Sequence, residues 1–243
     1  DGLDAPAIDL AGTGSVVVVA PHPDDETLGA GGLIAAAAAV GVPVHVLLLT
    51  RGERSHPDSP TTTPEALATA RDAEFVAALR TLHPDVTSTS VGIPDGATRE
   101  HRDRVVESLD TVLADADRPV LLVAPWRGDG HRDHRIAGEV AEAAAASAPD
   151  VDLLAYPIWA WHWDDPDHSV APWADVRALS LPDDLVARKR AALDAYPSQT
   201  RPLSHAPGDE AIVDDRHAAH HLRTTEWFFA PGSAASRSRE SFD

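Results

Sequence analysis

The chain contains no cysteine and no methionine, and Lys189 is the only lysine among its 243 residues. Without cysteine it can form neither a disulfide nor a thiolate metal site, so any metal must be bound by histidine and carboxylate side chains. No apolar run approaches the ~20 residues that span a membrane, and no signal peptide is recognisable. We expect a cytoplasmic protein with no membrane span.

The chain also has few positively charged residues. Asp and Glu number 39 against 20 Lys and Arg, which gives a formal net charge of −19 at pH 7. This balance argues against nucleic acid or an anionic membrane as partner, and it is compatible with a neutral small-molecule substrate. The hydrophobic fraction of 43% indicates a globular chain. We expect one domain over residues 1–243, with an irregular lead-in at 1–14 and a flexible tail at 231–243; a homo-oligomer is compatible with this sequence.

Runs of branched aliphatic residues alternate with segments of helical periodicity. Buried strands are predicted at 16–19, 42–50 and 119–124, a short strand at 86–91, and helices at 27–40, 63–82, 99–116 and 136–148. Further strands are predicted at 153–163 and 176–181, helices at 183–195 and 209–222, and an edge strand at 225–230. Because strands that alternate with helices form parallel sheets covered on both faces, we predict an α/β fold, a Rossmann-like three-layer sandwich with a mostly parallel sheet.

Two dense polar clusters follow two of these strands directly. PHPDDE (21–26) follows the first strand, and GHRDH (130–134) follows the strand at 119–124. Ligands of open α/β sheets bind beyond the carboxyl ends of the strands, so the two clusters can face each other across one crevice. The other interpretation is that the acids cap helix N-termini, where negative charge is stabilising. A helix needs only one such cap, whereas the first cluster alone contains one His and three acids.

The side chains of the two clusters suit a hydrolytic metal site. His22 and Asp25 are three residues apart, so both can reach one point. With one histidine of the second cluster they would supply three protein ligands and leave one position open. Asp24 can accept the proton of a metal-activated water. The other histidine of the second cluster would stabilise the oxyanion and protonate the leaving amine, with Asp133 holding that histidine in the right tautomer.

Aromatic residues make up only 5% of the chain, but several of them cluster at 153–163. In a strand, Trp159, Trp161 and Trp163 would share one face, which could line a carbohydrate pocket or could equally be sheet packing or an interface. His45, inside a predicted strand, fits a satisfied core or edge histidine better than a ligand. The histidines at 217, 220 and 221 fit a solvated helix face better than a metal site.

The first motif, with HRDH about a hundred residues later, resembles the PIG-L/LmbE-like N-acetylglucosaminyl deacetylases over nearly the whole chain. The resemblance implies a zinc-dependent N-deacetylase, with iron(II) as the alternative ion. It also implies which histidines bind the metal and which one is catalytic. The implied metal ligands are His22, Asp25 and His134; the implied catalytic residues are Asp24 as general base and His131 as oxyanion and proton partner, with Asp133 behind it.

The resemblance extends beyond the two clusters. Arg71 and Asp95 match positions that contact sugar hydroxyls, and Lys189 with the segment 198–199 matches a late structural or pocket-forming region. Asp129 stands where the mycothiol-type members carry tyrosine. We therefore expect a substrate other than that of the mycothiol type, with the same chemistry.

Together these features predict an enzyme that removes the acetyl group from an N-acetylglucosamine-type amino sugar or conjugate. Arg71, Asp95, Trp159 and Trp161 are the candidate substrate-binding residues. Two alternatives stay open. The same site could act as an amidase on a larger sugar conjugate, or the chain could be a non-catalytic sugar- or nucleotide-binding module with a structural metal. A closed shell of four protein ligands would indicate the binding module.

Overall fold

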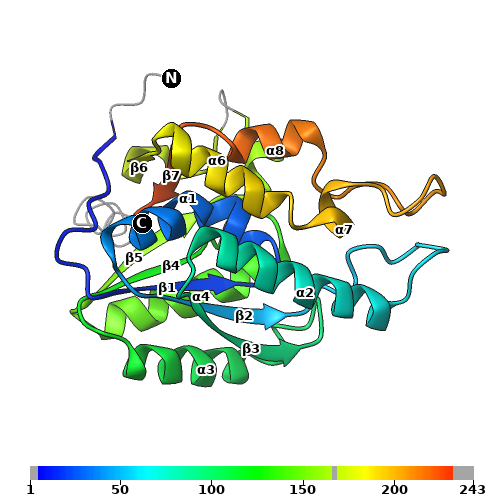
Figure 1. Ribbon diagram of the computed structural model, residues 1–243. Coiled ribbons are helices and arrows are strands. Elements are labelled where there is room, and N and C mark those ends of the chain that lie inside the picture. Colours follow the sequence, from blue (N-terminus) through cyan, green and yellow to red (C-terminus); the bar gives the residue numbers. More distant parts are fainter. Residues whose placement is uncertain (1–4, 166–168, 232–243) are drawn as a thin grey trace.

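One seven-stranded sheet organises the chain (Figure 1). The structure is a computed structural model that describes residues 5–165 and 169–231. Across the sheet the strand order is β3-β2-β1-β4-β5-β7-β6. The strands are β1 (Ser15–Ala20), β2 (Val44–Thr50), β3 (Thr87–Ile93), β4 (Val120–Pro125), β5 (Val151–Tyr156), β6 (Val176–Ser180) and β7 (Thr225–Phe229).

The first five strands run parallel, and the last two run antiparallel to their neighbours. From β1 the chain first adds β2 and β3 on one side and then returns to add β4 and β5 on the other. The strand order therefore reverses between β1 and β4, and their registers align Val16 with Leu121 and Val18 with Val123. Such a reversal opens a crevice at the carboxyl ends of the two strands, where α/β proteins bind ligands.

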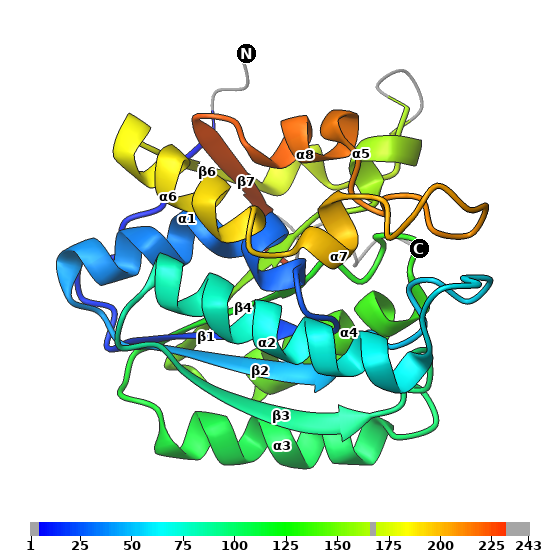
Figure 2. The same ribbon diagram turned by 45° about the vertical axis from the view of Figure 1, so that its right-hand side comes forward.

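Two helical layers cover the sheet, as Figures 1 and 2 show, and the predicted three-layer α/β fold is confirmed. Helices α1, α2 and α6 pack on one face, and α3 and α4 pack on the other. Short helical turns complete the loops between the later elements. The helices are α1 (Asp25–Val40), α2 (Pro64–Leu82), α3 (Arg102–Asp115), α4 (Arg132–Ser147), α5 (Ala160–Trp163), η1 (Trp173–Asp175), α6 (Asp183–Leu193), α7 (Pro197–Thr200) and α8 (Asp215–His221).

The central strands are buried on both faces, which explains their continuous apolar sequence. All six residues of β1 are buried. Val16 and Val18 belong to the core beneath α1 and α2, whereas Val17 and Val19 belong to the core beneath α3 and α4. A strand that serves two cores cannot alternate polar and apolar residues, and the run of four valines follows from this position.

Helix α1 packs so closely on its neighbours that it needs glycine at two positions. A Cβ on Gly29 would lie 2.1 Å from the Tyr156 ring, and one on Gly32 would lie 2.5 Å from Leu181. The space beside Gly31 and Gly32 holds a buried ion pair, in which Lys189 Nζ lies 2.6 Å from Glu226 Oε1. These contacts clamp α1, whose N-terminus carries the first polar cluster.

Three later predictions are wrong in detail. The segment 153–163 is not one strand: β5 ends at Tyr156, and the tryptophans that follow lie in and beside the short helix α5. The strand at 225–230 exists as β7, but it lies between β5 and β6 and is not an edge. The predicted helix 209–222 forms only as α8, since the preceding segment is an irregular loop.

Residues 5–14 form no helix or strand longer than one bridge, from Ala7 to Ala178, as the irregular lead-in predicts. Most of the predicted flexible tail, 232–243, lies outside the described residues. Within the described residues, no helix is long and apolar enough to cross a membrane.

Candidate active site

The two polar clusters meet beside a cavity of about 290 Å³ at the carboxyl ends of β1 and β4. The first cluster occupies the turn into α1, and the second occupies the turn into α4. Loops 51–63 and 201–214 extend side by side next to the cavity (Figures 1 and 2), joined where His56 Nε2 lies 3.0 Å from the Glu210 carbonyl oxygen. Both loops contribute to the lining, through Arg54 and Ser55 from the first and Ile212 and Val213 from the second.

Three side chains converge as a candidate metal-binding group. Asp25 Oδ2 lies 3.0 Å from His22 Nδ1 and 3.3 Å from His134 Nε2. His134 Nε2 is buried and has no hydrogen-bond partner. Ligand atoms bound at 2.0–2.1 Å to a tetrahedral zinc lie about 3.3 Å apart, so Asp25 Oδ2 lies at such a spacing from each of the two ring nitrogens.

The electrostatics of this group favour positive charge. Burial alone would lower the pKa of His134, but Asp25 and Asp129 raise it to about 9. Burial would likewise lower the pKa of His22, and Asp133 and Asp25 hold it well above its usual range. Burial would raise the pKa of Asp25, and the two histidines hold it well below its usual range. A site that stabilises charge on both rings suits a bound cation.

Asp129 supports His134 and was not recognised from the sequence. It is fully buried, and its Oδ2 accepts a hydrogen bond of 2.7 Å from His134 Nδ1. A carboxylate only accepts, so Nδ1 keeps its proton, and Nε2 is the ring nitrogen that releases its proton when a metal binds. The only sequence signal is an acid in a Gly-Asp-Gly turn, five residues before His134, which has no periodicity that distinguishes it from an ordinary turn.

Asp133 faces His22, and the prediction that its carboxylate stands behind His131 is wrong. Its Oδ2 lies 3.1 Å from His22 Nε2, while its two oxygens also accept from Gly96 N–H and from the Thr98 hydroxyl. That contact keeps a proton on His22 Nε2, so Nδ1, which lies beside Asp25, is the ring nitrogen that can bind a metal. Only the backbone N–H of Asp133 contacts His131.

Asp95 lies on the same side of His22. Its Oδ1 is 3.3 Å from His22 Nε2, and its Oδ2 accepts from the backbone N–H of Arg54. His22, His131 and His134 offer ligand atoms within 4.8 Å of one another, and His22, Asp95 and Asp133 form a second such group. Since Asp133 is already saturated by Gly96 and Thr98, we regard this second group as support for the His22 ring.

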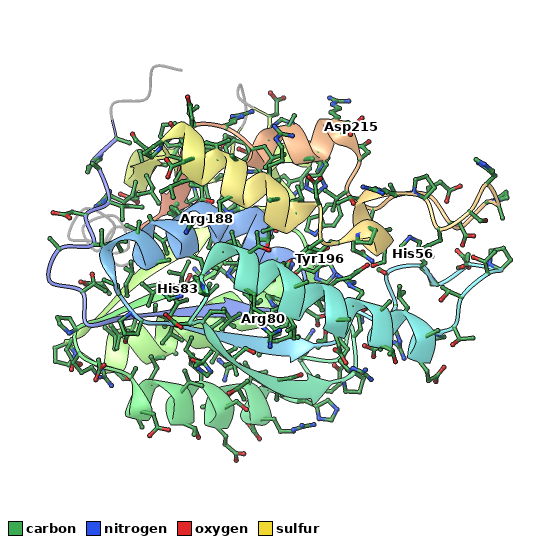
Figure 3. The ribbon with its side chains drawn as sticks, in the orientation of Figure 1. His56, Arg80, His83, Arg188, Tyr196 and Asp215 are labelled. Atoms are coloured by element: carbon green, nitrogen blue, oxygen red, sulfur yellow. The ribbon has the colours of Figure 1, made fainter. Side chains whose placement is uncertain are left out.

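Asp24 is held in an unusual backbone conformation. Its φ of 113° makes it the only non-glycine residue with a positive φ among the described residues. Its N–H donates to Glu26 Oε2, and Glu26 Oε1 accepts a 2.5 Å hydrogen bond from Tyr196, which lies just after α6 (Figure 3). Such a conformation persists only where surrounding contacts enforce it, and it turns the Asp24 side chain to the cavity that it lines.

Arg71 holds the Asp24 carboxylate from the other side. Its Nη2 lies 3.2 Å from Asp24 Oδ2 and also donates to the Pro23 carbonyl, while Nη1 donates to the Gly52 carbonyl. Burial raises the pKa of Asp24 to about 7, with Arg71 opposing the shift and the neighbouring carboxylates of Asp25 and Glu26 adding to it. A carboxylate near this pKa can both take and return a proton at neutral pH.

His131 caps α4 and borders the cavity. Its Nδ1 accepts a 3.2 Å hydrogen bond from the Asp133 N–H, so the neutral ring carries its proton on Nε2. Burial lowers the pKa of His131 to about 4, and the neighbouring rings of His134 and His22 add to this effect. The residue is therefore a neutral hydrogen-bond donor at the cavity wall.

The four predicted substrate-binding residues do not lie together. Arg71, Asp95 and Trp159 line the cavity, but Trp161 does not. Trp161 stacks on His220 with ring centroids 5.9 Å apart, beneath the guanidinium of Arg223. The prediction assumed a strand, in which alternate residues share a face; a helical turn separates the two indoles instead.

The histidines of α8 are also not the solvated face that was predicted. His217 is 2% exposed and lines the cavity, and His221 is 6% exposed and contacts the Leu28 carbonyl. His220 is half-buried against Trp161. In contrast, His45 is satisfied by the hydroxyls of Thr87 and Thr89 and makes no other side-chain hydrogen bond, as a structural histidine should.

Comparisons with known proteins agree with this geometry. The PIG-L family model, described as GlcNAc-PI de-N-acetylase, matches residues 17–145, more than half of the chain. The chain is 28% identical to the conserved protein TT1542 from Thermus thermophilus, with a TM-score of 0.63 over 89% of this chain and 94% of that one.

Two curated relatives are deacetylases. A probable N-acetyl-alpha-D-glucosaminyl L-malate deacetylase 2 of Bacillus subtilis (strain 168) is 31% identical over 128 residues, 51% of this chain and 57% of the relative. A 1D-myo-inositol 2-acetamido-2-deoxy-alpha-D-glucopyranoside deacetylase of Corynebacterium glutamicum (strain R) is 34% identical over 161 residues, 56% of this chain and 54% of the relative. The matches thus span little more than half the length of these relatives. The matched region contains both polar clusters, and the chain belongs to the PIG-L family.

Proposed function

We propose that the chain is a metal-dependent N-deacetylase that removes the acetyl group from an N-acetylglucosamine-type amino sugar or conjugate. The observation that carries this proposal is the orphaned, buried Nε2 of His134, 3.3 Å from Asp25 Oδ2, at a cavity that Asp24 and His131 also line. The names of the two curated relatives, both deacetylases of acetylated glucosamine derivatives, support the same chemistry.

His22, Asp25 and His134 would hold the ion through Nδ1, Oδ2 and Nε2. The donor set of two imidazoles and one carboxylate suits zinc and also iron(II), and we favour zinc. Once bound, such an ion would polarise a water molecule and the acetyl carbonyl. Asp129 and Asp133 each fix one histidine ring in the tautomer that this binding requires.

Asp24 is proposed as the proton carrier. It takes a proton from the attacking water while the new C–O bond forms, and it returns that proton to the sugar nitrogen when the C–N bond breaks. The products are then the free amine and acetate, and no other reactant is needed. Arg71 and the Glu26–Tyr196 pair keep the carboxylate at the cavity.

His131 is proposed to stabilise the oxyanion. Its Nε2–H is available because Nδ1 already accepts from the Asp133 backbone. The sequence also predicted that this residue protonates the amine. Since its lowered pKa keeps it neutral in the metal-free chain, we assign that proton to Asp24 and the charge stabilisation to His131.

Metal analysis and acetate release on one batch of protein test the proposal. We expect about one zinc or iron per chain and release of acetate from N-acetylglucosamine conjugates that a chelator abolishes. Asp24→Asn should abolish turnover while keeping the metal, because Asn tolerates the positive φ but cannot carry the proton. The matched control is Asp110→Asn, an exposed change on α3.

Each outcome distinguishes the alternatives. Full activity in Asp24→Asn would refute the base assignment. Bound metal without acetate release from any conjugate would indicate a binding module with a structural ion. Release only from large conjugates would indicate the amidase alternative. That the acceptor differs from that of mycothiol-type members stays a prediction, which the same substrate series tests.

A further inference from the structure

The lining of the same cavity also contains two buried polar side chains with unused hydrogen-bonding atoms. Gln199 is 1% exposed and His217 is 2% exposed, and both line the cavity. Gln199 Oε1 has no hydrogen-bond partner, and neither ring nitrogen of His217 has one. Buried polar atoms in folded proteins are normally paired, so two on one cavity wall call for a partner that enters the cavity.

The unused atoms are mainly acceptors. The amide nitrogen of Gln199 donates to the Ser198 hydroxyl at 3.0 Å and to the Ser55 hydroxyl at 3.3 Å, which leaves the carbonyl oxygen free. The Ile212 backbone lies near the His217 ring without forming a hydrogen bond of acceptable geometry. A neutral imidazole has one N–H group and one nitrogen with a lone pair. With its N–H group toward the Ile212 backbone, His217 presents the lone pair of the other nitrogen to the cavity.

The surroundings keep His217 neutral and therefore able to accept. Burial lowers its pKa to about 4, and His162 and His220 add to this effect, while Asp214 opposes it. The ring packs 5.1 Å from Trp159 and 4.1 Å from His162, centroid to centroid, and these contacts hold it in place. A neutral imidazole beside an indole face presents one polar edge and one flat apolar surface.

We propose that Trp159, Gln199 and His217 form the sugar-binding wall of this cavity. In this proposal, which rests on the proposed function, Gln199 and His217 accept hydrogen bonds from hydroxyl groups of the acetamido sugar, and Trp159 packs against a C–H face of its ring. A cavity of about 290 Å³ is at the small end of ligand pockets, so it suits one sugar ring, with any further part of a conjugate outside.

All three residues lie outside residues 17–145, the part that the family model matches. The matched part contains the metal-binding group, Asp24 and His131. The wall therefore belongs to the part of the chain in which substrate preference can differ between family members that share the chemistry.

Steady-state kinetics on the zinc-loaded enzyme test this wall. For His217→Ala we expect KM for an N-acetylglucosamine conjugate to rise roughly 3- to 10-fold, with kcat within about twofold, since one hydrogen bond of uniform binding is lost. His217→Gln, which restores an acceptor, should recover most of the loss. The matched control, His220→Ala, changes a histidine on the same helix that does not line the cavity and should leave KM unchanged.

Deoxy analogues of the sugar give an independent readout on the wild-type enzyme. We expect one analogue that lacks a single hydroxyl to raise KM in the wild type and to cause no further rise in His217→Ala or Gln199→Ala. Melting temperature and zinc content verify that each variant is folded and loaded. If His217→Ala does not fold, the analogue series with Gln199→Ala, which removes the other free acceptor of the wall, provides the comparison.

The outcomes separate the two proposals. Suppose that the wild type is active but His217→Ala has an unchanged KM, or that no deoxy analogue changes KM. Either result refutes the proposed sugar-binding wall and leaves the proposed deacetylase function intact. A wild type that binds zinc but releases no acetate from any conjugate overturns the proposed function and the wall with it.

Discussion

Replacing Asp129 by asparagine is a sharp perturbation of the metal site, because it changes one atom and no volume. The carboxylate accepts four hydrogen bonds: from His134 Nδ1 at 2.7 Å and from the backbone N–H groups of Ile158, Trp159 and Ala160 at 2.9, 3.0 and 2.9 Å. It is fully buried, so water cannot replace a lost acceptor. An amide has one oxygen and one NH₂ group, and it cannot accept all four.

Both orientations of the new amide are unfavourable. With NH₂ toward Ile158 and Ala160, two backbone donors lose their acceptor. With NH₂ toward His134, the ring must accept at Nδ1 and carry its proton on Nε2, which removes the lone pair that the metal needs. Each buried donor left unpaired costs about 1–3 kcal/mol of stability.

For Asp129→Asn we expect zinc affinity to fall by roughly 10- to 100-fold, which is about 1.4–2.7 kcal/mol of binding free energy. Competition with a chelator of known affinity measures the change, and urea unfolding of the metal-free protein measures the loss of stability separately. Asp152→Asn, exposed on β5, is the control. A folded Asp129→Asn variant that binds zinc within threefold of the wild type would refute the role of Asp129 in fixing the His134 tautomer.

Two further predictions concern stability. Lys189→Met leaves Glu226 buried with only the N–H groups of Gly32 and Leu33 as donors, so we expect the free energy of unfolding to fall by about 3 kcal/mol and the melting temperature by roughly 6–12 °C. Adding Glu226→Gln removes the unpaired charge but turns an NH₂ group toward one of these donors, so it should recover only about 1 kcal/mol, and a double variant no more stable than Lys189→Met would contradict the pairing. The pKa of His217 is about 4 when folded and about 6.5 when unfolded, so its contribution to stability is complete above pH 6.5 and is lost as the pH falls toward 4. Between pH 7 and 5 the wild type should therefore lose about 2 kcal/mol more than His217→Gln in urea unfolding, and equal losses would show that the ring is not desolvated as the structure indicates.

The sequence predicted most of the sheet correctly because burial on both faces imposes a local pattern. β1, β2 and β4 are short aliphatic runs, and the helices between them begin and end at local signals. The clearest signal is at α2, where the Thr63 side chain accepts a hydrogen bond from Ala66 N–H and Pro64 occupies the first turn. Errors begin after Tyr156, where tryptophans separated by one residue fit a strand by periodicity but lie in a helical turn.

The residues that bring the chemistry were recognisable from the sequence because they are contiguous. A histidine and carboxylates directly after a buried strand must lie at the carboxyl edge of the sheet, and the parallel topology then places the clusters of β1 and β4 side by side. The convergence of His22 and Asp25 on one point is local, because both are on one turn. No comparable local relation connects either residue to His134, which is more than a hundred positions away.

Only the tertiary structure decided what supports those residues and what faces them. Asp129 accepts a hydrogen bond from His134 because the turn after β4 packs against the start of α5. Asp133 contacts the His22 ring and not that of its neighbour His131. The packing of α8 places His217 in the cavity lining. Hydrogen bonds between distant segments depend on side-chain direction in space, which no spacing along the chain encodes. The sequence by itself therefore determined the layered fold and the chemical groups of the site, and the packing of distant elements determined their tautomers, their partners and the wall that faces them.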